Sequence, residues 1–232
     1  MAASDLSADA ARLVARALLD IDAVHCRADE PYTLTSGLAS PVYVDCRRVI
    51  SYPRARKLII GLMAAKLART VGVEAFDAVA GGETAGIPYA AWLAEDMGLP
   101  MLYVRKKPKG FGRNAQIEGA MADGARVLLV EDLATDGGSK LRFAEALREA
   151  GGSCAHAVVV FYYGIFGNAP AVLADAGLSL HHLATWWDVL EVSRKDGRFD
   201  PATLDTVEAF LKAPLDWSRA HGGVGELASG AR

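Results

Sequence analysis

Two adjacent carboxylates, Glu131 and Asp132, separate an apolar run from a short turn rich in glycine and hydroxyl groups. The run, Val127 to Val130, has no polar alternation, which predicts a strand buried on both faces of a parallel sheet. Open α/β sheets bind ligands outside the carboxyl ends of their strands, where two carboxylates can accept hydrogen bonds from neighbouring hydroxyls. The pattern therefore favours a sugar such as ribose.

The turn after these carboxylates has the composition of a phosphate site. Gly137 and Gly138 allow the backbone to approach an anion, and Ser139 is expected to cap the helix that follows. The unpaired N–H groups of that helix end, with the hydroxyls of Thr135 and Ser139, would hold a phosphate. The helix dipole would add roughly 0.3–1 kcal/mol. The segment thus predicts a site for a phosphorylated sugar.

Other interpretations of this turn fit less well. The Walker pattern ends in Gly-Lys-Ser/Thr and the dinucleotide fingerprint needs three spaced glycines, whereas here the acids precede the turn and Lys140 follows it. An ordinary strand–turn–helix corner would explain the glycines. It would not explain two adjacent acids at the end of a buried strand.

Two further segments carry groups suited to a diphosphate. Gly81 to Gly86 is a second glycine-rich turn between an apolar strand and a helix, although alone it could equally be a plain turn. A basic segment containing glycine and proline is expected to be a mobile loop that closes over anionic substrate, with a solvated charged loop as the alternative. Its cations are Arg105, Lys106, Lys107, Lys109 and Arg113.

The elements that would position these groups follow from apolar spacing. An amphipathic helix is expected over Leu13 to Ile21, then a hairpin with strands Tyr32–Leu34 and Val42–Cys46. Alternating strands and helices predict a mainly parallel sheet with crossover helices. The expected strands are 76–80, 101–105, 126–130, 155–161 and 180–184. The expected helices are 87–97, 140–150, 201–212 and one from Ser51 and Pro53 to Gly72 with the stripe Leu58, Leu62, Ala65 and Leu67.

The whole chain has 232 residues, of which 52% are hydrophobic, so we expect a single α/β domain over 1–232. Within it we expect an N-terminal helix and hood over about 1–50, a core over about 51–190 and a flexible tail over about 220–232. A net charge of −3 argues against nucleic-acid binding. No signal peptide or membrane span is apparent, which favours a cytoplasmic location without membrane contact. The separated cysteines Cys26, Cys46 and Cys154 are expected to be reduced.

The segment Arg126 to Ser139 resembles the phosphoribosyl diphosphate signature of type I phosphoribosyltransferases. Two more segments are similar to orotate phosphoribosyltransferases: Tyr32 to Gly37 with Ser40-Pro41 resembles their N-terminal hood, and Tyr103 to Arg105 with the following basic residues resembles their mobile loop. The resemblance covers about residues 12–190. It implies a mainly parallel central sheet with flanking helices plus a small N-terminal hood.

The resemblance also implies an activity and a site. Orotate and 5-phosphoribosyl 1-diphosphate would give orotidine 5′-phosphate and pyrophosphate in pyrimidine (UMP) biosynthesis. Mg²⁺ would be carried by the diphosphate rather than bound directly by the protein, and the loop would reach the active site of the neighbouring subunit of a homodimer. The implied catalytic residues are Lys109, Glu131 and Asp132. The implied diphosphate-sugar contacts are Thr84, Ala85, Arg105, Lys106, Lys109, Glu131, Asp132, Leu133, Ala134, Thr135, Asp136, Gly137, Gly138 and Ser139, and the expected orotate contacts are Thr135 and Tyr43.

Several positions depart from the family pattern. Phe111 replaces a loop histidine, Ala85 replaces a lysine of some relatives, and Gly164 falls where some carry an orotate-binding arginine. The hood lysine of many relatives is also absent, since Thr35 and Ala39 occupy the candidate positions. A phosphoribosyltransferase for another base, such as a purine, is therefore an alternative. A non-catalytic regulator is a second alternative, although about thirty residues before the hood are too few for a DNA-binding domain.

Overall fold

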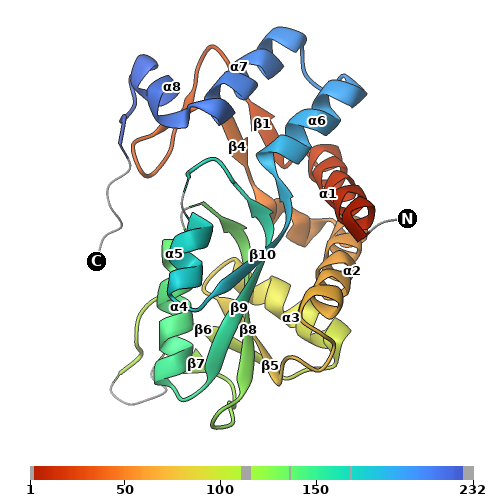
Figure 1. The fold of residues 1–232 in the computed structure, drawn as a ribbon, viewed down its shortest axis with the longest axis vertical. Coiled ribbons are helices and arrows are strands. Elements are labelled where there is room, and N and C mark those ends of the chain that lie inside the picture. Colours follow the sequence, from red (N-terminus) through yellow and green to blue (C-terminus); the bar gives the residue numbers. More distant parts are fainter. Residues whose placement is uncertain (1–2, 111–115, 136, 168, 227–232) are drawn as a thin grey trace. The chain divides into compact units, whose positions relative to one another are not determined.

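The computed structural model describes residues 3–110, 116–135, 137–167 and 169–226 (Figure 1). The chain divides into two compact units. One comprises Ile50–Tyr162 and Asn168–Leu183, and the other comprises Met1–Val49, Tyr163–Gly167 and Ala184–Arg232. We call the first the sheet unit and the second the hood unit.

A six-stranded sheet organises the sheet unit, in the order β10-β9-β8-β5-β6-β7. The pairs β9–β8, β8–β5 and β5–β6 are parallel, and β7 is antiparallel to β6. This arrangement confirms the predicted mainly parallel sheet with flanking helices. The strands are β5 (Ala78–Gly82), β6 (Met101–Val104), β7 (Ile117–Glu118), β8 (Arg126–Ala134), β9 (Ser153–Tyr162) and β10 (Ser179–Thr185).

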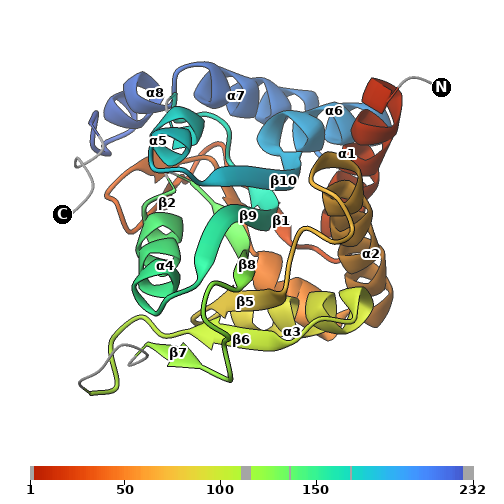
Figure 2. The same cartoon turned by 60° about the horizontal axis from the view of Figure 1, so that its bottom comes forward.

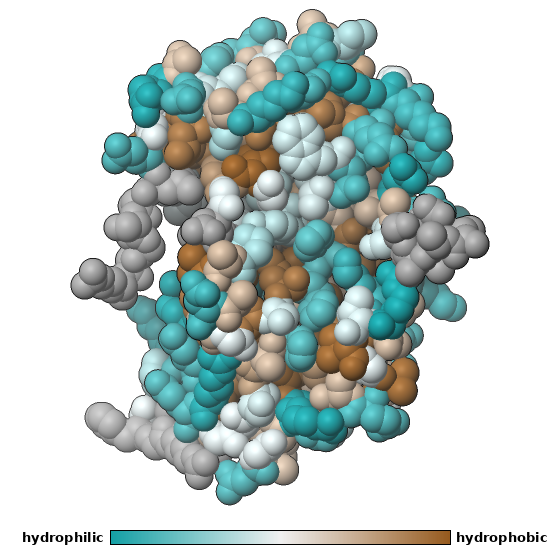
Figure 3. All heavy atoms as spheres, in the orientation of Figure 1, coloured by the Kyte–Doolittle hydropathy of each residue, from teal (hydrophilic) through white to brown (hydrophobic). Residues whose placement is uncertain are grey.

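Helices cover both faces of this sheet. Helix α3 (Gly86–Met97) packs on β5 and β8 and against α2 (Pro53–Thr70), while α4 (Gly138–Glu149) lies on the opposite face (Figures 1 and 2). The short helix α5 (Ala169–Asp175) precedes β10. Figure 3 shows hydrophilic residues over the outer surface of α4. Its inner face contributes Phe143 and Leu147 to a core shared with Leu129.

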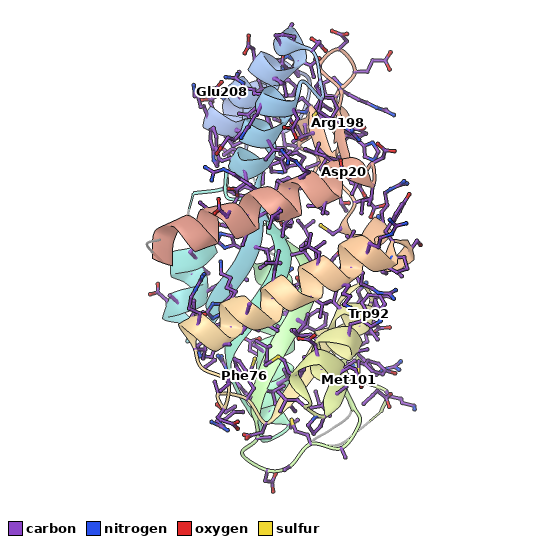
Figure 4. All side chains as sticks on the ribbon, turned by 90° about the vertical axis from the view of Figure 1, so that its right-hand side faces the viewer. Asp20, Phe76, Trp92, Met101, Arg198 and Glu208 are labelled. Carbon is purple, nitrogen blue, oxygen red and sulfur yellow. The ribbon has the colours of Figure 1, made fainter. Side chains whose placement is uncertain are left out.

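Helix α2 starts at Pro53, as predicted, but its buried stripe is not the predicted one. Leu58 is 37% exposed, and Ala65 is exposed as well. The buried side chains of α2 are Ile59, Ile60, Met63 and Leu67. The prediction followed the leucines, whereas packing selects the face that meets neighbouring elements. The guanidinium of Arg56 lies 4.2 Å from the ring centroid of Trp92 on α3, where Figure 4 shows that tryptophan below α2.

The hood unit contains two small antiparallel ladders and four helices within the described residues. Strand β1 (Val24–Cys26) pairs with β4 (Val42–Val44), and β2 (Tyr32–Thr33) pairs with β3 (Ala39–Ser40). The predicted hairpin between Tyr32–Leu34 and Val42–Cys46 is therefore wrong. Its second strand pairs instead with β1, a short segment that gave no strand pattern. A 3₁₀ turn, η1 (Cys46–Ser51), follows β4.

The helices of the hood unit are α1 (Ala3–Asp20), α6 (Trp186–Asp196), α7 (Pro201–Lys212) and α8 (Pro214–Ala220). Helix α1 buries Val14 and Leu18, as its apolar spacing predicted, and packs on α6. Arg198 donates to the carbonyl of Leu19 at 2.7 Å (Figure 4). Helices α6 and α8 were not predicted.

Two general expectations can be compared with the described residues. The three cysteines are free, and burial raises the pKa of the Cys26 thiol to about 12 and that of Cys154 to about 11. Within the described part of the chain, every helix is too short or too polar to cross a bilayer.

Candidate functional site

Three loops leave the same edge of the sheet. In the parallel register, Gly82 of β5 pairs with Val104 of β6, and Gly81 pairs with Val130 of β8. The carboxyl ends of these strands therefore lie side by side, as expected for a ligand site at this edge. The loops that follow contain the two glycine-rich turns and the described part of the basic segment.

Glu131 is held in a buried network at the end of β8. Its Oε2 lies 2.6 Å from Nζ of Lys140, and it accepts a hydrogen bond from the Ser139 hydroxyl at 3.1 Å. Lys140 also donates to the carbonyl oxygen of Leu133. The side chains of Lys140 and Glu131 are only 7% and 10% exposed. One of the two predicted carboxylates is thus paired with a buried cation, whereas Asp132 is partly exposed.

The turn between β8 and α4 differs in detail from its prediction. Gly137, with φ +85°, is the N-cap of α4, and Ser139 lies inside the first turn. The prediction that Ser139 caps the helix is therefore wrong, because its hydroxyl donates to Glu131 instead. Thr135 is partly exposed beside the start of this helix. Asp136, also predicted here, lies outside the described residues.

Leu133 and Ala134 contribute to the site through backbone groups of β8 rather than through their side chains. Ala134 is fully buried against Val159 and Tyr162, so only its backbone is available to a ligand. The carbonyl of Leu133 accepts from Lys140.

The turn after β5 is glycine-rich because the chain is crowded there. A Cβ on Gly86 would lie 2.3 Å from the carbonyl oxygen of Val130, and one on Gly81 would lie 2.6 Å from that of Gly86. A side chain on either residue would push α3 away from the sheet. Thr84 is exposed and Ala85 partly exposed in this turn, at the same edge as the turn after β8. This placement is the one predicted.

The basic segment begins at the end of β6, and its first residues are fixed by hydrogen bonds. The N–H of Lys106 donates to Oε2 of Glu83 at 2.7 Å, which links this segment to the turn after β5. Nη1 of Arg105 lies 3.4 Å from Oε1 of Glu118, and Nζ of Lys109 lies 3.8 Å from the same oxygen. Such partly exposed pairs stabilise little, so the cations remain available to an anion. Arg113 and Phe111 lie outside the described residues.

Tyr43, predicted to contact the base, belongs to the hood unit. Its hydroxyl accepts from Arg47 at 3.0 Å, and its ring lies 5.6 Å from that of Tyr32 and 6.3 Å from that of His25. Gly164 adopts φ +66°, a conformation that an arginine would rarely take. The glycine there therefore suits the local backbone.

Sequence reasoning missed two residues of this edge, Lys140 and Glu118, whereas the family resemblance had already placed Glu83 in the pyrophosphate turn. A signal for Lys140 was present, because it precedes Phe143, Ala144 and Leu147 at helical spacing and so falls on the apolar face of α4. Glu118 gave no such signal, because its contacts depend on the pairing of β6 with β7.

The site can supply oxygen ligands for magnesium only in part. Among the described residues, no group of three or more His, Cys, Asp or Glu side chains is placed to hold a metal. Asp132 is a partly exposed carboxylate at the sheet edge, and Mg²⁺ is commonly bound by one or two carboxylates together with substrate phosphates. The residues present therefore fit an ion that arrives with a diphosphate.

Comparisons with known proteins agree with this geometry. A family model described as the phosphoribosyl transferase domain matches residues 51–189. An orotate phosphoribosyltransferase of Cereibacter sphaeroides is 62% identical over 210 residues, covering 90% of each chain, and one of Sinorhizobium fredii is 59% identical over 219 residues, covering 94% of each chain.

Solved structures show the same similarity. The orotate phosphoribosyltransferase of Aeropyrum pernix gives a TM-score of 0.67 at 31% identity, with coverage of 81% of this chain and 99% of that one. The Mycobacterium tuberculosis protein, solved in complex with 5-phospho-α-D-ribosyl 1-diphosphate, gives 0.59 at 29% identity, covering 79% and 98%.

Proposed function

The chain belongs to the phosphoribosyltransferase family, and from this premise we propose that it is an orotate phosphoribosyltransferase. It joins orotate to 5-phosphoribosyl 1-diphosphate and forms orotidine 5′-phosphate and pyrophosphate, a step of pyrimidine biosynthesis. The observation that carries the proposal is the adjacency of Asp132, the turn at Gly137 and the basic segment at one sheet edge. The identity of 59–62% to relatives named for this activity supports orotate as the base.

The chemistry explains why these groups are needed together. The ring nitrogen N1 of orotate forms a bond to C1′ of the sugar as the C1′–O bond to diphosphate breaks, and the electron pair of that bond leaves with pyrophosphate. Positive charge develops on the sugar ring while negative charge grows on the leaving oxygens. Orotate reacts through its deprotonated nitrogen, so orientation of the two substrates is the main task. We assign no general base.

The residues divide this work by charge. Glu131 and Asp132 accept hydrogen bonds from the sugar hydroxyls, and the backbone of the turn at Gly137 with the Thr135 hydroxyl holds the 5′-phosphate. Lys109, assisted by Arg105 and Lys106, stabilises the departing diphosphate. Thr84 and Ala85 offer a second cradle for it. Magnesium carried by the diphosphate would add positive charge at the leaving group. Tyr43 and Thr135 contact the base.

The whole chain, residues 1–232, is one phosphoribosyltransferase domain, which is supported by relatives that align over 90% of it. The protein is a cytoplasmic homodimer, and the basic segment of one subunit completes the site of the other. It acts without nucleic acid or membrane.

The test of the base compares four bases, each supplied separately. The protein is incubated with 5-phosphoribosyl 1-diphosphate, magnesium and either orotate, uracil, adenine or hypoxanthine, and nucleotide formation is followed by chromatography. Orotate alone should react. Product from hypoxanthine or adenine would favour the purine alternative motivated by Gly164 and Ala85. No product from any base, together with a gel shift on DNA, would favour the regulator.

Shared sites are tested by mixing two inactive variants. Lys109→Ala should reduce mainly kcat, because the lysine acts on charge formed in the transition state. Asp132→Asn should inactivate the subunit that carries it. Refolded mixtures of the two should regain activity, since a hybrid dimer contains one intact site. Mixtures as inactive as the separate variants would argue against sharing.

A further inference from the structure

A buried lysine lies beside the carboxylates of the site, and the reaction above gives it no role. Nζ of Lys140 lies 2.6 Å from Oε2 of Glu131 and 3.1 Å from Oγ of Ser139, and it also donates to the carbonyl of Leu133. An ammonium group has three hydrogens, so these three acceptors use all of them. Lys140 therefore has no donor left for a substrate and must act through its neighbours.

The two carboxylate oxygens of Glu131 have different surroundings. Oε2 accepts from both Lys140 and Ser139. Oε1 lies beside Gly82, at 2.7 Å from the position that a Cβ on this glycine would take. Gly82 is the last residue of β5. Oε1 is thus at the carboxyl edge of the sheet, whereas Oε2 is committed to the protein.

The position of Lys140 is unfavourable for helix α4 itself. It is the third residue of α4, where the positive end of the helix dipole disfavours a cation. Burial of the ammonium also removes it from water, which proteins tolerate when the charge is paired. The carboxylate of Glu131 offsets both the unfavourable interaction with the helix dipole and the loss of hydration. Lys140 therefore serves the carboxylate rather than the helix.

We propose that Lys140 is a positioning residue that holds Oε2 of Glu131 and thereby orients Oε1 to accept one hydroxyl of the bound sugar phosphate. This inference rests on the proposed function.

The test measures binding of 5-phosphoribosyl 1-diphosphate with magnesium by titration calorimetry between pH 6 and pH 9. Lys140→Met removes the charge and keeps an unbranched chain of similar size. Lys66→Met is the matched control, because Lys66 lies on α2 in the same unit and donates to the backbone carbonyl of His182. A third variant, Glu131→Gln with Lys140→Met, removes both charges and leaves neither one buried without a partner.

A carboxylate that is buried without its cation takes up a proton more readily and then no longer accepts from the sugar in the same way. We expect Lys140→Met to bind about tenfold more weakly than wild type at pH 7 and to approach wild type at pH 9. Lys66→Met should follow wild type throughout. The double variant should bind more weakly than wild type by a factor that does not change with pH.

Two results would overturn the inference: wild-type affinity in Lys140→Met at pH 7, or a loss that is equal at every pH. If Lys140→Met fails to fold, the double variant tests the inference instead. That variant has no carboxylate at position 131, so recovery of its binding at pH 9 would assign the pH dependence to another group and contradict the inference. Binding is measured without a base. Failure of wild type to bind the sugar phosphate would therefore contradict the proposed function, whereas normal wild-type binding with an unaffected Lys140→Met would contradict this inference alone.

Discussion

Strand β8 forms one ion pair at its first residue, Arg126, and another at Glu131 after its apolar run, and the two pairs differ in almost every physical respect. At the amino end, Arg126 binds Asp77 through three hydrogen bonds: its backbone N–H donates at 2.8 Å, Nε at 2.9 Å and Nη2 at 2.7 Å. Both side chains are about half exposed. At the carboxyl end, Glu131 and Lys140 are buried and one oxygen of the glutamate lies at the sheet edge.

The comparison shows that the ion pair at one end of the sheet contributes to stability alone, whereas the ion pair at the other end also serves the reaction. The exposed pair has good geometry and water around it, so loss of one partner leaves the other solvated. The buried pair is costly to break, because the remaining charge has neither water nor a partner. A buried ion pair of this kind is expected where the reaction needs a carboxylate that is shielded from water. The carboxyl edge is such a place, and the amino end is not.

The largest expected effect concerns Asp132, the partly exposed acid at the carboxyl edge of the sheet. Asp132→Asn should lower kcat by about 10²–10³-fold, because the carboxylate stabilises charge that forms in the transition state. Asp77→Asn is the same chemical change at the other end of the sheet and should leave kcat unchanged. Steady-state rates with orotate measure both. An equal loss in the two variants would remove the distinction between the ends.

The second effect is on stability. Lys140→Met should lower the free energy of unfolding by about 3–5 kcal/mol, since it leaves a buried carboxylate unpaired. Adding Glu131→Gln should restore part of that loss. Urea denaturation of the two variants measures the difference. If the double variant were no more stable than Lys140→Met, the cost would lie in packing rather than in the unpaired charge.

The third effect concerns crowding at the carboxyl edge. Gly86→Ala should destabilise by about 1–3 kcal/mol, because its Cβ would lie 2.3 Å from the carbonyl of Val130. Gly61→Ala is the control, since a Cβ at this exposed position of α2 meets nothing within 4 Å. It should stabilise the helix by roughly 0.5–1 kcal/mol. Thermal unfolding that places both variants on the same side of wild type would contradict this account.

The smallest effect is the pH dependence of the exposed pair. Hydrogen bonds from the Arg126 side chain, and then from its backbone N–H, hold the pKa of Asp77 well below its usual value of 3.8. The folded state therefore binds this proton less readily than the unfolded state. The resulting stability is present above about pH 4 and is lost as the pH falls. Asp77→Asn should flatten the acid side of the stability curve, with little change at pH 7.

Sequence patterns predicted the elements of the site because each follows from local chemistry. The apolar run of β8 ends in acids and glycines, and α4 repeats its apolar residues at helical spacing, so neither required knowledge of distant contacts. The strand runs on to Ala134, four residues beyond its prediction, because polar Glu131 and Asp132 were taken as its end. The mainly parallel direction of the sheet also followed from the alternation of strands and helices.

The errors share a different cause. The hood hairpin was assigned to neighbouring segments, but β4 pairs with β1, whose His25 and Cys26 carry no strand signal. The buried face of α2 depends on which elements lie beside it. Lys140 was noted only as evidence against a Walker motif, because a charged residue is expected to be solvated. Each of these features depends on long-range packing that no local window contains.

The contact between Glu131 and Lys140 also constrains how this sequence can change over generations. An aspartate at position 131 would be one methylene shorter, about 1.5 Å of reach, and would separate from the ammonium that now lies 2.6 Å away. A lysine at position 140 would then be a buried charge with no acid beside it. We expect positions 131 and 140 to vary together. A chain with the shorter acid at position 131 should carry a smaller or uncharged residue at position 140.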